Sequence, residues 1–374
     1  MTIGAVTSFV FNGENVFAAT ANSGVYLSTD KGRNWTQVNT GLTTNHVYAL
    51  AINGTYLFAG TMGGGIFLST NNGTTWTAVN NGWVPSWVPN SWVHSFVVKG
   101  KYIFAGDYNF GVFVTTNNGS NWIPVNDGFV SYSAGALAIS GNKILAGSYD
   151  GVYVSNNNGT YWSKVFNEFP GSYAAFLETI GTNIISGNYD SGIFLSTDNG
   201  TTWVKIFNNF DHGGVSNIKT SGTNIYVGAY DGIWLSTDNG TNWNSVSDGL
   251  PTNSDVSSIY ISSSDIYIGT VNGIFFRSMH ETMSSLVKEY RLFQNYPNPF
   301  NPATTITYSI AEDGHIKLFI YSILGSKVAT IVDETKPAGS YSIQFNGSNL
   351  NSGIYFYKLE AGQFTQVKKM TLIK

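Results

Sequence analysis

Acidic side chains recur along the chain inside a polar turn that ends in tryptophan, and repeated carboxylates are what acid–base catalysis would need. The turn reads Ser-x-Asp-x-Gly-x-x-Trp, with Thr for Ser once and with Asn for Asp in half of the copies. The copies are Ser28–Trp35, Ser69–Trp76, Thr115–Trp122, Ser155–Trp162, Ser196–Trp203 and Ser236–Trp243. The acidic position is occupied in turn by Asp30, Asn71, Asn117, Asn157, Asp198 and Asp238.

This alternation of acid and amide argues against catalysis. An amide cannot do the proton chemistry of a carboxylate, but Asp and Asn both accept hydrogen bonds from nearby backbone N–H groups. Glycine supplies a positive φ, and the tryptophan is expected to cover apolar area between neighbouring units. These tryptophans are Trp35, Trp76, Trp122, Trp162, Trp203 and Trp243. The motif therefore predicts a repeated structural part.

A second set of candidates lies in the turns between the second and third strands expected in each unit. Four consecutive units place a tyrosine there and three of them add an aspartate. The residues are Tyr108, Tyr149, Tyr189, Tyr230, Asp150, Asp190 and Asp231. Aromatic rings beside carboxylates suit sugars or polar peptides. The alternative is structural, because Asp-Gly pairs such as Asp150-Gly151 form tight hairpin turns.

A third candidate is the connection "NNGWVPSWVPNSWVHSF", which is five residues longer than its counterparts and holds Trp83, Trp87 and Trp92. Loops are normally polar, so this composition indicates either a stacking or partner-binding edge or a lid packed on its own unit.

Other chemistry finds little support. The chain has three arginines, Arg33, Arg277 and Arg291, too few for a sialidase site, so that activity is excluded. His46, His94 and His212 lack any recognised metal-ligand spacing. A glycosidase needs a pair of carboxylates, and no spacing singles out such a pair. We predict no catalytic residue, no metal and no cofactor.

The elements that position these residues follow from an internal repeat. The segment "GVYLS" at Gly24 returns as "GIFLS", "GVFVT", "GVYVS", "GIFLS", "GIWLS" and "GIFFR", at steps of 41, 46, 40, 41, 40 and 41 residues. Each unit reads as four short strands with a Gly-containing turn after the first. A period of this length is typical of a β-propeller blade.

The polar turns resemble the Asp-box (BNR) repeat of sialidase-like, sortilin-like and photosystem-assembly-factor propellers. The resemblance implies a propeller and says little about function, because enzymes and non-enzymes share the repeat. The seventh unit, Val256–Ser278, has three strands and neither the Asp box nor its tryptophan. Residues 1–278 are thus expected to form seven blades, the last lacking its own fourth strand.

Composition narrows the function classes. The chain is 42% hydrophobic and 11% charged with 42 glycines, which suits an all-β protein rich in turns. A net charge of −4 argues against a nucleic-acid partner. The absence of cysteine removes disulfides and thiolate sites. No apolar run is long enough for a transmembrane helix. The first residues do not read as a signal peptide, so we expect the natural chain to begin earlier.

The C-terminal segment has a different sequence pattern and lacks the repeat. After an expected linker at 279–293, "NYPNPFNP" opens a run of short alternating strands over 294–374, which predicts a small Ig-like β-sandwich. This motif, "YSILGSKV", "AGSYSIQFNGSNLNSGIYFYKLEAG" and the terminal "KKMTLIK" closely resemble the type A sorting domain of the type IX secretion system. The resemblance implies export through that machinery to the cell surface or the medium.

These features predict an all-β chain, a seven-bladed β-propeller followed by a small Ig-like sandwich. Our first hypothesis is a secreted, non-catalytic propeller that binds a glycan or a protein. The second is a secreted polysaccharide-acting glycoside hydrolase on the same fold. The third, a periplasmic assembly factor, is disfavoured by the sorting domain.

Overall fold

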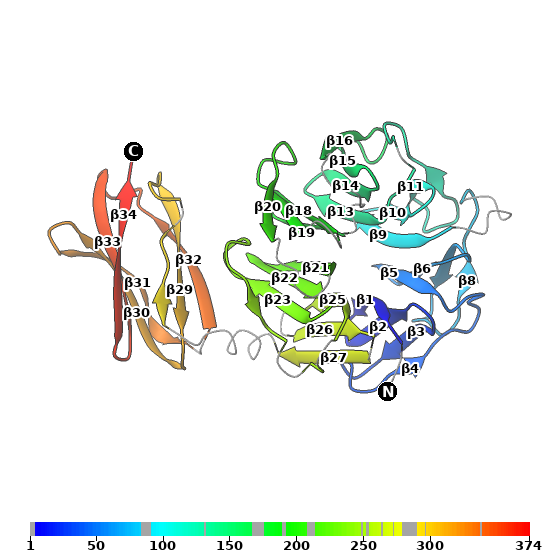
Figure 1. The fold of residues 1–374 in the computed structure, drawn as a ribbon, viewed down its shortest axis with the longest axis horizontal. Helices are drawn as coiled ribbons and strands as arrows, with labels where there is room; N and C mark the ends of the chain where they lie inside the picture. Colours follow the sequence, from blue (N-terminus) through cyan, green and yellow to red (C-terminus); the bar gives the residue numbers. More distant parts are fainter. Residues whose placement is uncertain are drawn as a thin grey trace. The chain divides into compact units, whose positions relative to one another are not determined.

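A computed structural model of the chain describes residues 4–83, 91–130, 132–166, 176–188, 192–207, 214–247, 250–251, 254–262, 265–271, 273–278, 290–295, 297–336 and 339–374. These residues form β-strands, turns and irregular segments, with no helix among them (Figure 1). The chain divides into two compact units, Met1–Phe276 and Arg277–Lys374. The polypeptide is therefore all-β throughout its described part.

The first unit is a series of small antiparallel sheets, each made from consecutive strands. The first sheet contains β1 (Val6–Asn12), β2 (Asn15–Thr20), β3 (Gly24–Ser28) and β4 (Thr36–Gln37). The second contains β5 (Val47–Asn53), β6 (Tyr56–Thr61), β7 (Ile66–Ser69) and β8 (Thr77–Ala78). The third contains β9 (Val93–Lys99), β10 (Tyr102–Asp107), β11 (Gly111–Thr115) and β12 (Ile123–Pro124). The fourth contains β13 (Ala136–Ser140), β14 (Lys143–Ser148), β15 (Gly151–Ser155) and β16 (Ser163–Phe166).

The remaining sheets of this unit repeat the pattern. The fifth contains β17 (Phe176–Ile180), β18 (Asn183–Asn188), β19 (Gly192–Ser196) and β20 (Val204–Phe207). The sixth contains β21 (Val215–Ser221), β22 (Asn224–Ala229), β23 (Gly232–Ser236) and β24 (Asn244–Ser245). The seventh has three strands in the described residues, β25 (Val256–Ile261), β26 (Asp265–Thr270) and β27 (Gly273–Ser278).

The sheets are arranged in a ring, with the first strand of each sheet innermost (Figure 1). These inner strands touch in cyclic order, β1 to β5, β9, β13, β17, β21 and β25, and β25 touches β1. The Thr7 hydroxyl donates to the Val47 carbonyl at 2.7 Å, and the Ser258 hydroxyl donates to the Val6 carbonyl at 2.9 Å. The first and last sheets are therefore joined directly, and the ring closes.

The second strand of each sheet is almost completely buried, because both of its faces pack on neighbouring sheets. In β10, for example, Ile103, Phe104 and Ala105 have no exposed surface. Small residues are required near its end, because a Cβ on Gly106 would lie 2.5 Å from the carbonyl oxygen of Ala134, just before β13. The alanine and glycine residues of these strands thus let adjacent sheets approach closely.

The second unit contains two sheets around one core. One sheet has the order β28 (Arg291–Leu292), β29 (Ala303–Ile310) and β32 (Gly339–Asn346). The other has the order β31 (Lys327–Lys336), β30 (Gly314–Ser322), β33 (Gly353–Ala361) and β34 (Phe364–Leu372). Alternate residues such as Ile306, Leu318, Tyr357 and Met370 fill the space between the sheets.

Candidate functional site

The six polar turns connect the third strand to the fourth, outermost strand in each of the first six sheets, and we call them the outer turns. They share one hydrogen-bond pattern. In the first copy, the Ser28 hydroxyl donates to Asp30 Oδ1 at 2.8 Å and accepts the Gly32 N–H at 2.7 Å. The Asn34 N–H donates to the same carboxylate oxygen at 2.8 Å. These bonds favour the ionised acid and hold the pKa of Asp30 at about 2.

The amide copies make the same turn. Asn71 Oδ1 accepts from the Ser69 hydroxyl at 2.9 Å and from the Thr75 N–H at 2.9 Å. The residue before each motif glycine also has a positive φ, as in Asn72 at 54°. An asparagine or lysine tolerates that conformation at modest cost. The acidic position therefore closes a turn, whichever residue occupies it.

The tryptophans of these turns link successive sheets. The indole N–H of Trp76 donates to the Val38 carbonyl at 2.7 Å, that of Trp122 to Val79 at 3.0 Å, and that of Trp162 to Val125 at 2.8 Å. Trp203 and Trp243 reach back to Val165 and Ile206 in the same way. The indole of Trp35, in the first sheet, donates instead to Gly32 in its own turn, at 2.9 Å.

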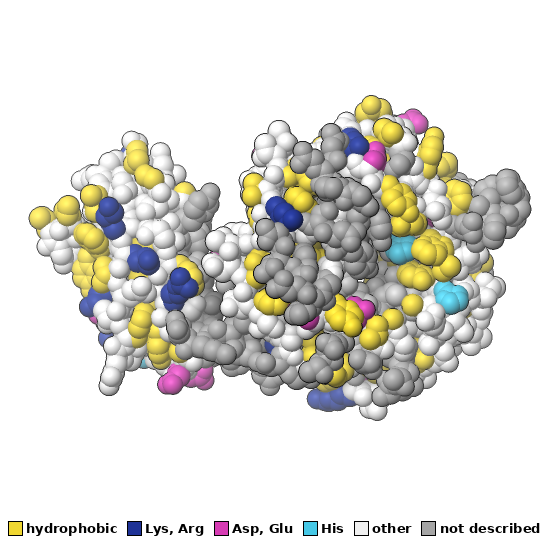
Figure 2. All heavy atoms as spheres, viewed as in Figure 1, with side chains coloured by type: hydrophobic (Ala, Val, Ile, Leu, Met, Phe, Trp, Pro, Cys, Tyr) yellow, Lys and Arg dark blue, Asp and Glu magenta, His cyan; other side chains and the backbone are white. Residues whose placement is uncertain are grey.

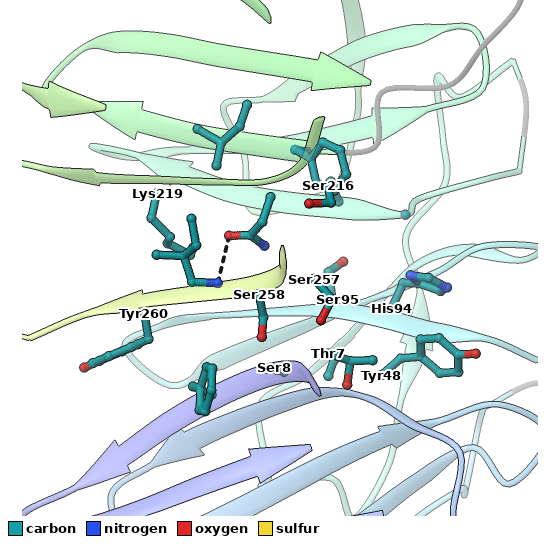
Figure 3. A pocket seen from close by; sticks show the side chains of 18 of the residues that line it. Thr7, Ser8, Tyr48, His94, Ser95, Ser216, Lys219, Ser257, Ser258 and Tyr260 are labelled. Carbon is teal, nitrogen blue, oxygen red and sulfur yellow. Dashed lines mark hydrogen bonds between the residues drawn. The ribbon is translucent and has the colours of Figure 1, made fainter. Parts of the chain in front are cut away.

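The candidate binding site is the channel at the centre of the ring. Residues from all seven inner strands or the residues just before them line a cavity of about 530 Å³, which is within the usual range for small-ligand pockets. Figure 3 shows Tyr48 and His94 at one end and Lys219 and Tyr260 at the other, with serines between them. Lys219 is paired with Glu178 at 2.8 Å.

A β-bulge near the start of five inner strands aims one side chain into this channel. The register shifts between Val6 and Ser8, and the same irregularity follows the equivalent valine in β5, β9, β21 and β25. The bulged residues are Thr7, Tyr48, His94, Ser216 and Ser257, and all of them line the cavity. Bulges re-aim side chains and are frequent beside functional sites.

Aromatic rings gather at the channel mouth beside the second, third and fourth sheets, and we call this cluster the aromatic wall. It consists of Tyr48, Trp92, His94, Tyr108 and Tyr149. Ring centroids are 4.9 Å apart for Tyr48–His94, 5.7 Å for Trp92–Tyr108 and 5.1 Å for Tyr108–Tyr149. The space-filling view shows yellow and cyan side chains gathered next to the middle of the ring (Figure 2).

His94 occupies an unusual environment within the wall. Burial lowers its pKa to about 4, so the imidazole is neutral at pH 7. Its Nε2 atom is buried and has no hydrogen-bond partner among the described residues, and neither has the hydroxyl of neighbouring Ser95. Buried polar atoms normally have partners. A ligand that entered the channel could supply them.

The opposite side of the mouth is polar and contains small residues. Thr7, Ser216 and Ser257 stand where the wall has Tyr48 and His94, and Asp255 lies just before the last bulge. Burial raises the pKa of Asp255. A ligand in the channel mouth would thus meet aromatic rings on one side and hydroxyl and carboxyl groups on the other.

The structure brings three of the predicted ligand residues together, namely Trp92, Tyr108 and Tyr149. Asp150 instead accepts from the Tyr153 hydroxyl at 2.6 Å and from Lys164 Nζ at 2.9 Å, and Asp231 accepts from the Trp234 indole at 3.1 Å. Tyr230 is about half exposed. Tyr189, Asp190 and Trp87 lie outside the described residues.

The prediction that Trp83 belongs to a ligand-binding edge needs correction, because its ring is packed inside the protein. It is buried, packs 4.1 Å from the Phe113 ring, and donates to the Ser91 hydroxyl at 2.9 Å. Sequence reasoning also missed Tyr48 as a site residue and considered His94 only as a metal ligand. Five of the seven inner strands start with a valine followed by a variable residue, and this pattern could have found both.

In the described part of the chain, no group of three or more His, Asp or Glu residues is placed to hold a metal ion. The same part contains no helix long and apolar enough to cross a membrane.

The ring of sheets is a propeller-like fold, as comparison with solved structures shows. YCF48 bound to D1 peptide superposes with a TM-score of 0.61 at 14% identity, covering 74% of this chain and 92% of that one. PorZ, a surface component of the type-IX secretion system of Porphyromonas gingivalis, gives 0.56 at 15% identity, covering 99% of this chain and 60% of that one. The extracellular domain of BT4673 from B. thetaiotaomicron superposes with a TM-score of 0.62 at 12% identity, covering 99% of this chain and 57% of that one. At these identities the similarity concerns the fold alone.

The C-terminal segment has an identifiable family. Residues 294–374 match the secretion system C-terminal sorting domain. A domain of this kind implies export by the type IX secretion system to the outer-membrane surface or the medium. The search of curated protein sequences returned no match.

Proposed function

We propose that this chain is an exported, non-catalytic binding protein whose ligand site is the channel mouth lined by the aromatic wall. The observation that carries the proposal is the convergence of five rings from three sheets on one side of the mouth. Aromatic faces opposite hydroxyl groups suit a sugar, which has apolar faces and a polar rim. The ligand class is therefore a glycan first and a polar protein segment second.

The architecture behind this site is a seven-bladed β-propeller of the Asp-box type, followed by an Ig-like sandwich that serves for sorting. Seven inner strands in cyclic contact support the blade count, and the shared turn geometry supports the Asp-box assignment. We further propose that residues 1–278 form the binding domain, that 279–293 link the domains and that 294–374 engage the type IX machinery.

Binding to a glycan array by the full chain tests the ligand. Trp92→Ala and Tyr108→Ala should each weaken binding at least tenfold, since stacked rings are often the main contributors to affinity. Tyr161→Ala is the matched control, because Tyr161 is an exposed tyrosine in an outer turn. The site assignment fails if the wall variants bind as well as the control. Deleting residues 294–374 should abolish export in a host that carries the secretion system.

Asp255 favours the alternative, a polysaccharide-acting glycoside hydrolase. It lines the channel, and its raised pKa is the property of a general acid. The hydrolase needs a second carboxylate 5–10 Å away. Asp190 is the candidate from the sequence, and it lies outside the described residues. YCF48, which shares the fold, has been solved with a peptide, and this keeps the protein-ligand alternative open. Release of reducing sugar from any polysaccharide, abolished by Asp255→Asn or Asp190→Asn, would establish the enzyme.

A further inference from the structure

One acidic residue of the propeller unit is buried behind the aromatic wall rather than exposed in a turn. Asp107, the last residue of β10, has no exposed surface. The equivalent position in other sheets holds Thr20, Thr61 and Thr270, and each of these hydroxyls closes its turn onto a glycine carbonyl. The third sheet thus replaces a small neutral residue with a carboxylate.

The Asp107 carboxylate joins two of the segments that carry the wall, the one with Trp92 and the one with Tyr108. Its Oδ1 accepts the N–H groups of Asn109 at 2.8 Å and Phe110 at 3.1 Å, which fixes the turn that holds Tyr108. Its Oδ2 accepts the Ser91 hydroxyl at 2.7 Å, and Ser91 in turn accepts the Trp83 indole at 2.9 Å. Ser91 directly precedes Trp92 in the chain, so this bond holds the segment that carries the Trp92 ring.

We propose that Asp107 is a positioning residue for the channel-mouth site and that the charge on its carboxylate holds Trp92 and Tyr108 in their binding arrangement. The inference rests on the proposed function only in calling this arrangement a binding site. All of the bonds to the carboxylate are from donors, so the ionised form satisfies every one of them. A carboxyl protonated at Oδ2 would still accept the two backbone N–H groups at Oδ1, but it would have to donate to the Ser91 hydroxyl, which reverses that bond and removes the acceptor of the Ser91 hydrogen.

Protonation occurs in an accessible pH range. Burial raises the pKa of Asp107 to about 6, against the opposing effect of the hydrogen bonds. No charged group contributes to this shift. The titratable neighbours of Asp107 are His94 on β9 and Tyr108, the next residue in the chain. Asp127 and Tyr132, in the connection before β13, are exposed. Strands β11 and β13 contain no titratable residue. His94 remains neutral until about pH 4, so of these neighbouring groups Asp107 is the one that titrates in this window.

The test is a pH titration of the full chain, followed by near-ultraviolet circular dichroism. The wild type should show a transition with a midpoint near pH 6, with far-ultraviolet signal unchanged. Asp107→Asn and Asp107→Thr should remove the transition, and Thr is a residue that the fold accepts at this position elsewhere. Trp92→Phe should reduce its amplitude, and His94→Gln should leave its midpoint in place. A flat wild-type titration, or a transition retained in Asp107→Thr, would overturn the inference.

The glycan array separates this inference from the proposed function. Binding that depends on Trp92 should weaken about tenfold between pH 7 and pH 5, because the charged fraction of a group with a pKa near 6 falls by that factor. Binding that depends on Trp92 but not on pH would refute the role of Asp107 and keep the binding site. If the spectral transition is present but the wall variants bind glycans as well as the wild type, the role of Asp107 stands and the binding site is refuted.

Discussion

The outer turns and the channel mouth of the same ring use aspartate in opposite ways. In the outer turns, Asp30 and Asp198 are partly exposed acceptors whose pKa is lowered to about 2 by hydrogen bonds. At the channel, Asp107 is buried and its pKa is raised to about 6. The turns are alike from copy to copy, whereas the bulged positions at the channel hold Thr, Tyr, His or Ser. Positions that are the same in every sheet therefore belong to the scaffold, and positions that differ between sheets line the candidate site.

The largest effect that would sharpen this comparison concerns a tryptophan between sheets. Trp162→Ala should lower the free energy of unfolding by about 3–5 kcal/mol, because it leaves a cavity in the core. Trp162 is 1% exposed and donates across to Val125. Urea unfolding of the variant measures the loss. Trp35→Ala is the matched control with a smaller expected loss, since Trp35 is only partly buried and bonds within its own turn.

A second prediction follows from the buried acid. The pKa of Asp107 is about 6 in the folded chain, whereas in the unfolded chain it returns to the ordinary value of an aspartate, 3.8. The stability of wild type relative to Asp107→Thr should therefore fall by about 2–3 kcal/mol as the pH rises from 4 to 6.5. Unfolding curves of both proteins across this range give the difference, in which the opposite contribution of His94 cancels. A difference that did not change with pH would contradict the raised pKa.

The outer aspartates should show the opposite sign. Because the pKa of Asp198 is lowered from 3.8 to about 2, its contribution to stability is present above pH 4 and is lost as the pH falls through 2. Asp198→Asn should therefore weaken the dependence of the thermal unfolding midpoint on pH between 4 and 2. An unchanged acid dependence in this variant would show that the turn bonds do not favour the charged form.

The smallest effect is expected for exchanging an amide for an acid in the turns. Asn71→Asp should change the free energy of unfolding by no more than about 0.5 kcal/mol at pH 7. The new carboxylate would accept from the Thr75 hydroxyl, as Asp198 Oδ2 accepts from Thr202 at 2.6 Å. Denaturant unfolding measures the change. A loss of several kcal/mol would mean that the two residue types are not interchangeable here.

Much of the scaffold could be predicted from the sequence because it depends on local rules. The period, the strand order within each unit and the turn residues repeat, and a short-range bond such as Ser28 to Asp30 needs only its own segment. The tyrosines of the candidate site could be proposed from the sequence for the same reason, since Tyr108 and Tyr149 recur in equivalent turns. Asp150 and Asp231 were candidates too, but local partners three residues further along the chain engage them.

The rest depended on the closure of the ring. Tyr48 and His94 lie 46 residues apart in the sequence, and only adjacent inner strands bring their rings to 4.9 Å. Whether Trp83 or Trp92 faces the channel depends on how the third sheet packs against its neighbours, and no local pattern encodes that. The sequence by itself determined the repeated sheets, their turns and the sorting domain. Tertiary structure decided which side chains meet at the mouth and which acid is buried, because burial and long-range proximity are properties of the packed ring.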